Sequence, residues 1–200
     1  MDEVKKLTRD FYTKSTLKVA KELLGKYIIR KVGKKELVGK IIETEAYIGP
    51  QDRASHSFGG KKTPRNRAEY LIGGHIYIYL VYGMYWQMNI STSEKGKPEC
   101  VLIRAIESEN GKVSLANGPG KFCRYLKLDK SFYGEDVTRS KRIWLEDRSP
   151  AFAKASAGRE KIKPSQILAT KRIGIDYAGP YWSRRKWRFL IKDYQKFLAK

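Results

Sequence analysis

Two carboxylates and one arginine lie in otherwise apolar segments, where ionisable side chains are unusual. Glu43 and Glu45 occur in IETEAY, and Arg104 occurs in VLIRAI. If residues 41–47 form a strand, the two glutamates point to the same face, and one can act as a general base that activates water. A buried arginine needs a carboxylate partner, and Glu45 is a candidate. Two solvated acids on an exposed strand, or a purely structural ion pair, are the alternatives.

Aromatic residues are concentrated in residues 76–89, IYIYLVYGMYWQMN. Tyr77 and Tyr79 share one face of the predicted strand, so one face builds core and the other offers an aromatic surface. Core packing with a hydrogen-bonded phenol is the alternative for either ring alone. Tyr82 precedes Gly83 near the tip of a predicted hairpin. A large ring at such a tip can wedge into a base stack, and an exposed turn aromatic is the alternative.

Residues 49–68 contain too many turn formers for regular structure and are predicted to be a long loop, a feature that is usually functional. His56 in this loop can stack or donate from its ring, although a lone histidine is more often structural. Thr63, Arg65 and Arg67 in KTPRNR form a reasonable set of phosphate contacts. A solvated turn is the alternative.

The charge balance points to a polyanionic partner. The chain has 42 Lys and Arg against 21 Asp and Glu, a net charge of +21. Self-repulsion of this size opposes compaction, and nucleic acid is the first candidate to relieve it, before a membrane surface. The segment SRRKWRF, residues 183–189, alternates cations with rings and suits phosphate contact plus stacking. General solubility, or a solvated basic tail, is the alternative.

Cysteine usage and hydropathy favour an intracellular, soluble protein. Cys100 and Cys123 have no CxxC spacing, so neither a disulfide framework nor a zinc site is expected. Two distant histidines, His56 and His75, are weak support for a metal. The sequence has no apolar signal core near residue 1 and no run long enough to span a membrane.

The predicted elements indicate an α+β class, a single domain built around a mainly antiparallel sheet. Capping residues and apolar spacing predict a helix over 15–25. β-branched and aromatic runs predict strands over 26–32, 36–48, 76–82, 84–91 and 100–106. Further helices are predicted within 117–128 and over 163–174, the latter with Pro164 at its start and Gly174 beyond its end.

Several long motifs, in order, resemble the alkyladenine (3-methyladenine) DNA glycosylases. They are ETEAYIGPQDRASHS, TPRNR, YIYLVYGMYWQMNIS, VLIRAIE and NGPGKFC. The resemblance covers nearly all of residues 1–200 and implies one glycosylase domain with a curved sheet, flanking helices and a protruding β-hairpin. It also implies a monofunctional base-excision enzyme that needs no metal or other cofactor.

By motif position, the resemblance implies roles for particular residues. Glu45 matches the base that activates water, and Arg104 lies beside that water. The rings that enclose a flipped base are Tyr47, His56 and Tyr79. Asn89 matches the amide that crowds the amino group of guanine, and Tyr82 the side chain that fills the gap in the duplex. We also expect Thr63, Arg65, Met84 and Tyr85 to contact the DNA backbone.

The chain departs from this pattern at a few positions. Glu69 and Tyr70 stand where some relatives have larger apolar side chains beside the bound duplex, so the sequence does not support a second wedge there. Gln87 interrupts an otherwise apolar strand and either shapes the cavity wall or faces solvent. The basic region 151–163 matches weakly, and no function is assigned to it.

The implied reaction is hydrolysis of the N-glycosidic bond of alkylated or deaminated purines: 3-methyladenine, 7-methylguanine, hypoxanthine and ethenoadenine. The implied partner is damaged double-stranded DNA, and no membrane association is expected. The protein is expected to be a monomer. The sequence does not rank these four bases. A non-catalytic nucleic-acid-binding module is the alternative function. A sugar hydrolase using Glu43 and Glu45, and a lyase with a Schiff-base lysine, are further alternatives.

Overall fold

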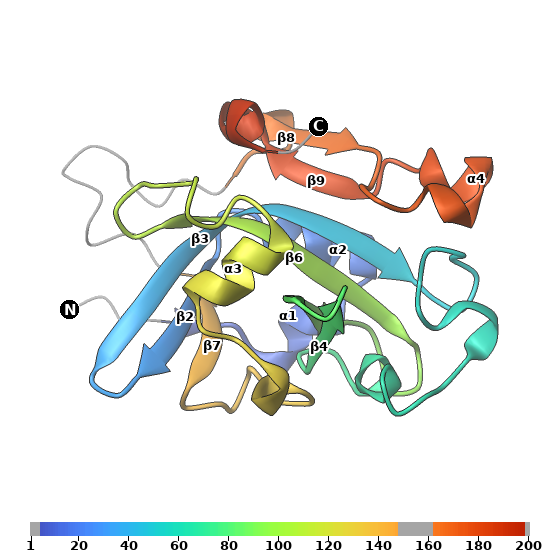
Figure 1. Ribbon diagram of the computed structural model, residues 1–200, viewed down its shortest axis with the longest axis horizontal. Helices are drawn as coiled ribbons and strands as arrows, with labels where there is room; N and C mark the ends of the chain where they lie inside the picture. The colour runs from blue at the N-terminus through green and yellow to red at the C-terminus, as the bar shows by residue number, and fades with distance from the viewer. Residues whose placement is uncertain (1–4, 148–161, 199–200) are drawn as a thin grey trace.

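The computed structural model of the protein describes residues 5–147 and 162–198, and the described strands form one antiparallel sheet (Figure 1). Their order along the sheet is β1 (Lys5–Lys6), β7 (Ile143–Asp147), β2 (Tyr27–Val32), β3 (Lys35–Ile48), β6 (Glu99–Ser108), β5 (Tyr85–Ser91) and β4 (Ile76–Val81). A second branch adds β9 (Arg188–Ile191), which pairs with β3 and with β8 (Ile167–Thr170). The α+β class and the antiparallel sheet are therefore confirmed.

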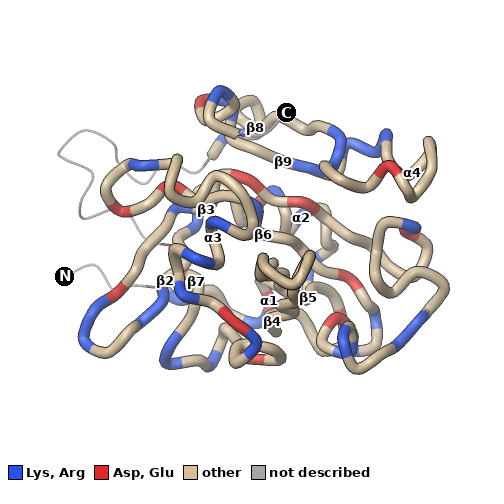
Figure 2. The backbone as a smooth tube through the Cα atoms, viewed as in Figure 1, with Lys and Arg blue, Asp and Glu red and all other residues tan. Residues whose placement is uncertain are grey.

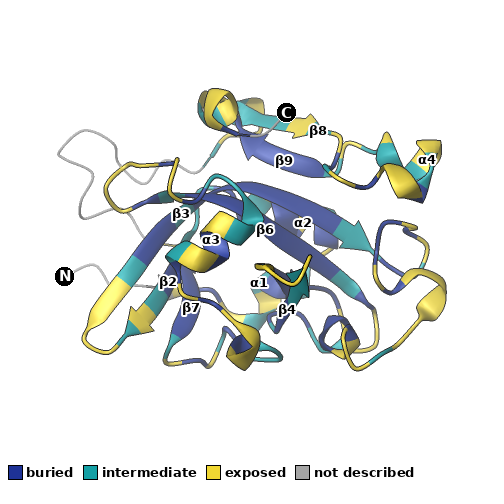
Figure 3. Ribbon diagram, in the orientation of Figure 1, coloured by how far each residue is buried: buried dark blue, intermediate teal, exposed yellow. Residues whose placement is uncertain are grey.

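Strand β3 organises the sheet and carries Glu43 and Glu45. It pairs with β2 through its first half and with both β6 and β9 through its second half. The register shifts around Glu43, and such a bulge bends a strand, so the sheet curves as predicted. Because neighbours cover β3, β6 and β9, most of their residues are buried (Figure 3).

The helices in the described chain are short. They are α1 (Arg9–Tyr12), α2 (Thr16–Glu22), α3 (Pro119–Tyr125) and α4 (Pro180–Ser183). Helix α2 buries Val19 and Ala20 against the sheet, and Gly25 follows it with φ +83°, which confirms the predicted helix and its glycine terminator. Short 3₁₀ segments connect other elements, at Phe58–Gly60, Arg67–Tyr70, Lys130–Phe132, Pro164–Gln166, Asp176–Ala178 and Lys192–Phe197.

Strands β4 and β5 form the predicted hairpin. Val81 pairs with Tyr85, and the Met84 N–H donates to the Val81 carbonyl at 3.0 Å, which leaves Tyr82, Gly83 and Met84 in the turn. Tyr82 and Gly83 both have positive φ, 52° and 67°. Glycine adopts this conformation freely, whereas tyrosine pays a steric cost. The Tyr82 side chain is 86% exposed, so the ring does not contribute to the core.

The prediction of a helix over residues 163–174 is wrong. Pro164–Gln166 forms one 3₁₀ turn, after which Ile167–Thr170 becomes β8. Ile167 pairs with Ile191 and Leu168 with Leu190. Pairing satisfies the backbone of β9 on the side away from β3, and this tertiary gain outweighs the weak helical pattern.

Cys100 and Cys123 are both buried free thiols. No helix in the described ranges has the length and apolar character needed to cross a bilayer. The basic region 151–163, to which the sequence assigns no function, lies almost entirely outside the described residues.

Candidate active site

A cavity of about 610 Å³ opens beside the β4–β5 hairpin. Its walls come from β3, the 49–68 loop, β4, β5, β6 and the segment 173–177, which are far apart in sequence. The volume falls within the range of small-molecule sites. The predicted residues that line it are Tyr47, His56, Arg65, Tyr79, Tyr82, Asn89 and Arg104.

Three of the rings that line the cavity, His56, Tyr77 and Tyr79, pack against one another. The centroids of His56 and Tyr79 are 4.7 Å apart, and those of Tyr77 and Tyr79 are 5.1 Å apart. The Tyr77 hydroxyl lies 2.6 Å from His56 Nδ1 and fixes the imidazole. Burial lowers the pKa of His56, as does the charge of Arg65. The aromatic face is therefore a cavity wall with a neutral imidazole, and Tyr77 is buried instead of belonging to an open surface.

Glu45 lies one layer behind this wall and is completely buried. Its Oε1 accepts from the Ile173 N–H at 2.9 Å. Its Oε2 accepts from the Tyr47 hydroxyl at 2.9 Å and lies 3.3 Å from Arg104 Nη1. Burial raises the pKa of Tyr47 well above its usual value, so the phenol acts as a donor. Tyr47, Arg104 and Ile173 all line the cavity, and they connect the carboxylate to it.

Arg104 bridges both glutamates. Its Nε donates to Glu43 Oε1 at 3.1 Å, and the same oxygen accepts from Nε of Arg188. Burial tends to lower the pKa of Arg104, but the charges of Glu45 and Glu43 outweigh it and the pKa is raised. The predicted Glu45 partner is confirmed, while Arg188 is buried and not part of the basic surface expected for SRRKWRF. A lone cation in the apolar run RFLI was the available signal for it.

A second buried ion pair holds the 49–68 loop against the segment that reaches Glu45. Arg172 donates to both carboxylate oxygens of Asp52, to Oδ1 at 2.9 Å, and both side chains are fully buried. The same guanidinium donates to the Ala46 carbonyl at 3.0 Å and lies 4.8 Å from the Tyr47 ring centroid. This pair fixes residue 173, whose N–H binds Glu45. Sequence reasoning missed it, because neither residue belongs to an apolar run.

Asn89 and Gln87 lie in the wall as neighbours on β5. Asn89 is 2% exposed and donates to the Tyr77 carbonyl at 3.3 Å. Gln87 Oε1 accepts from the Tyr79 hydroxyl at 3.1 Å. Gln87 therefore shapes the cavity and fixes a ring, which answers the question that its polar character raised.

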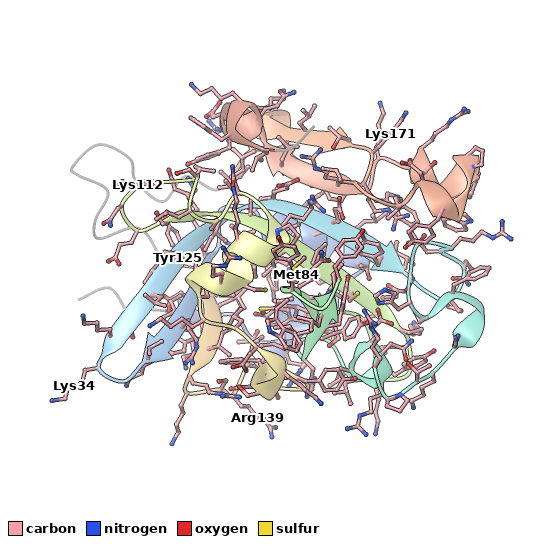
Figure 4. All side chains as sticks on the ribbon, viewed as in Figure 1. Lys34, Met84, Lys112, Tyr125, Arg139 and Lys171 are labelled. Carbon is pink, nitrogen blue, oxygen red and sulfur yellow. The ribbon has the colours of Figure 1, made fainter. Side chains whose placement is uncertain are left out.

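The mouth of the cavity is basic and aromatic. Met84 is 65% exposed on the hairpin turn (Figure 4), and Tyr82 and Tyr85 are exposed beside it. Arg65 lies 5.2 Å from the Tyr79 ring centroid. The Thr63 hydroxyl makes a hydrogen bond within its own loop, donating to Asn66 Oδ1 at 3.1 Å. Lys and Arg lie on turns throughout the described chain (Figure 2), so a polyanion can approach from several sides.

Glu69 is a cavity residue that sequence reasoning placed beside a duplex. It is 1% exposed, lines the cavity, and its Oε1 accepts from Cys100 Sγ at 3.6 Å. Burial raises the pKa of Glu69 to about 7, opposed in part by Cys100 and Ser57. Tyr70 instead donates to the carbonyls of Gly60 and Lys61. At the position where the resemblance implied an apolar wedge in some relatives, this chain has a buried acid.

We expect Glu69→Gln to change how stability depends on pH. The pKa of Glu69 is raised from 4.5 to about 7, so the folded protein keeps a proton that the unfolded chain loses. The free energy of unfolding of the wild type therefore falls as the pH rises from about 4.5 to 7. Above pH 7 it stays lower by roughly 3 kcal/mol. Urea denaturation at pH 4.5 and pH 8 should show the variant gaining that amount relative to wild type at the higher pH. An equal difference at both pH values would contradict the raised pKa.

Among the residues at 5–147 and 162–198, no group of three or more His, Cys, Asp and Glu side chains is arranged to hold a metal ion. His75 serves a turn, with Nδ1 2.8 Å from the Ile72 carbonyl.

Comparison with known proteins is consistent with this geometry. The family model described as methylpurine-DNA glycosylase (MPG) matches residues 10–195. Three relatives share the name "Putative 3-methyladenine DNA glycosylase". That of Borrelia garinii subsp. bavariensis is 40% identical over 97% of this chain and 100% of its own length. That of Desulfitobacterium hafniense is 38% identical over 96% of this chain and 98% of its own length. That of Clostridium novyi is 40% identical over 98% of this chain and 100% of its own length.

Proposed function

The chain belongs to the methylpurine-DNA glycosylase family, and on that premise we propose that it flips alkylated or deaminated purines out of duplex DNA and hydrolyses their N-glycosidic bond with a water activated by Glu45. As a member of this family, the protein is a DNA glycosylase that acts in DNA repair. The substrates within the proposal are 3-methyladenine, 7-methylguanine, hypoxanthine and ethenoadenine.

One observation carries the proposal: a ring-lined cavity lies between an exposed Tyr82 and a buried pair of Glu45 and Arg104. A base inside a duplex cannot be reached, so the nucleotide must rotate out at a cost of a few kcal/mol. Tyr47, His56 and Tyr79 would enclose the rotated base. Stacking on aromatic faces is worth about 1–3 kcal/mol per base, and a cationic purine gains about 0.5–2 kcal/mol more.

In the proposed step, the water oxygen bonds to the sugar C1′ and the bond from C1′ to the base breaks. The departing base takes the electron pair, and the water proton goes to Glu45. The carboxylate also stabilises the developing positive charge on the sugar. Arg104, whose Nη1 lies 3.3 Å from Glu45 Oε2, would orient the carboxylate. Because the Tyr47 hydroxyl donates to Glu45 Oε2, the water would share this oxygen with the phenol or pass its proton through it.

Selectivity against normal guanine is assigned to Asn89, whose amide is held rigidly on β5 and would clash with the exocyclic amino group. Thr63, Arg65, Met84 and Tyr85 are assigned to the DNA backbone around the mouth of the cavity. Met84 and Tyr85 are exposed for such a contact, and Arg65 is a cation at the rim.

The function is tested by incubating duplexes that contain each of the four bases with purified protein in the presence of EDTA and measuring the free base. We expect release that leaves an abasic site and no covalent adduct after borohydride treatment. Binding without release of any of the four bases would support the non-catalytic module. A trapped adduct would support a lyase.

Tyr82→Ala should lower single-turnover base release by about tenfold or more, because one aromatic stacking contact is worth roughly 1–3 kcal/mol. The ring is 86% exposed, so folding should be unaffected. Phe197→Ala removes another exposed ring, one that does not line the cavity, and serves as the matched control. Unchanged release from duplex DNA by the Tyr82 variant would remove the wedge from the proposal.

A further inference from the structure

A buried carboxyl group that the proposed reaction does not use lies in the cavity. Glu69 belongs to the 3₁₀ turn Arg67–Tyr70 and lines the cavity together with Tyr77, Asn89 and Cys100. Its Oε1 accepts from the Cys100 thiol, a weak donor. Its Oε2 is buried and accepts no hydrogen bond of normal geometry within the described chain; the Ser57 hydroxyl, which lies near the carboxyl group, donates to the Pro98 carbonyl instead. A carboxyl oxygen left this way is costly.

The nearby cations are engaged elsewhere. Arg104 is held by Glu43 and Glu45. Arg65 donates to the Leu80 carbonyl at 3.1 Å and packs over the Tyr79 ring. Within residues 5–147 and 162–198, no lysine or arginine forms a salt bridge with Glu69. The charge of this carboxylate is therefore not balanced by the protein, and the cavity would gain from a ligand that carries positive charge.

We propose that Glu69 is a specificity-determining residue that makes the cavity favour purines carrying positive charge, such as N-alkylated bases, over neutral damaged purines. The inference rests on the proposed function and deepens it. A cationic base in the cavity balances the charge of this buried carboxylate. A neutral base leaves the acid either uncompensated or protonated, and gains nothing from its charge.

The groups that face Glu69 do not change charge near neutral pH. Burial raises the pKa values of the phenols and the thiol around it, and burial lowers that of His56. These neighbours come from β4, β6, the 49–68 loop and the turns: Tyr77, Tyr79, Cys100, His56, Tyr70 and Tyr133. The Glu69 carboxyl, with a pKa of about 7, is thus the group in this wall that titrates between pH 6 and 8.

The test compares single-turnover release of 7-methylguanine, which is cationic in DNA, with release of hypoxanthine, which is neutral. Wild type, Glu69→Gln and Glu69→Leu are each measured at pH 6 and pH 8. Gln keeps the shape of the side chain and Leu removes both oxygens, so two variants guard against a local packing defect. Glu94→Gln, at a carboxylate that is 77% exposed, is the matched control.

At pH 8 we expect the ratio of the 7-methylguanine release rate to the hypoxanthine release rate to fall roughly tenfold or more in both Glu69 variants. This is the effect of a unit charge within about 8 Å at an effective dielectric constant near 20. The wild-type ratio should rise from pH 6 to pH 8, and the variant ratios should not follow it. A ratio equal to wild type, or an equal loss on both bases, overturns the inference. If wild type releases neither base, the proposed function fails instead.

Discussion

Glu45→Gln is expected to abolish base release, lowering the single-turnover rate by about a thousandfold or more, since removal of a general base typically costs 10²–10⁴. The variant also loses the negative charge that would stabilise the developing cation at C1′. An amide is nearly the same size as the carboxylate, so the cavity should keep its shape. Binding to a duplex with a damaged base should therefore persist while release is lost.

Two controls make this result interpretable. Glu36→Gln is the same substitution on the same strand, at an exposed position outside the cavity, and should release base at the wild-type rate. The thermal stability of Glu45→Gln must also be measured. Both oxygens of Glu45 face hydrogen-bond donors, so the N–H group of the new amide would face either the Ile173 N–H or Arg104 and Tyr47. A folded variant that releases base at the normal rate would show that another group activates the water.

Asp52→Asn is expected to destabilise the protein by about 3–5 kcal/mol, the usual cost of leaving a buried charge without its partner. Arg172 is fully buried, and Asp52 supplies two of its acceptors. The remaining contacts, to the Ala46 and Trp182 carbonyls, cannot balance a whole charge. Urea denaturation should show a lower midpoint with an unchanged slope.

Asp147→Asn is the matched control, because it breaks the pair with Lys26 at a carboxylate that is 52% exposed. Exposed pairs contribute about 0–1 kcal/mol, so a small change is expected there. Adding Arg172→Met to Asp52→Asn should recover part of the loss by removing the stranded charge. Equal effects at Asp52 and Asp147 would mean that the buried pair does not hold the loop.

Base release should fall along with stability in Asp52→Asn. Arg172 fixes the backbone next to Ile173, and the Ile173 N–H is one of the donors on Glu45. A loosened segment 172–173 would leave that carboxylate less well oriented. This link between a loop anchor and the reactive acid explains why an ion pair outside the apolar strands belongs to the site.

Local pattern was sufficient for several parts of this protein. The spacing of apolar residues located α2, and alternation located β3 to β6 and the hairpin turn with its exposed Tyr82. Arg104 was predicted to pair with Glu45 because a lone cation in an apolar strand has few ways to be satisfied. The order of long motifs then placed the aromatic and amide residues of the cavity.

The tertiary structure decided the contacts whose members lie far apart in the chain. Arg188 meets Glu43 across 145 residues and Arg172 meets Asp52 across 120, so no short window contains both partners. Ile167–Thr170 became a strand because β9 offered an edge to pair with. Glu69 became a buried, poorly solvated acid because its turn packs under β5 and β6. Periodicity encodes which face of an element is apolar, whereas burial and charge pairing depend on what the returning chain brings to that face.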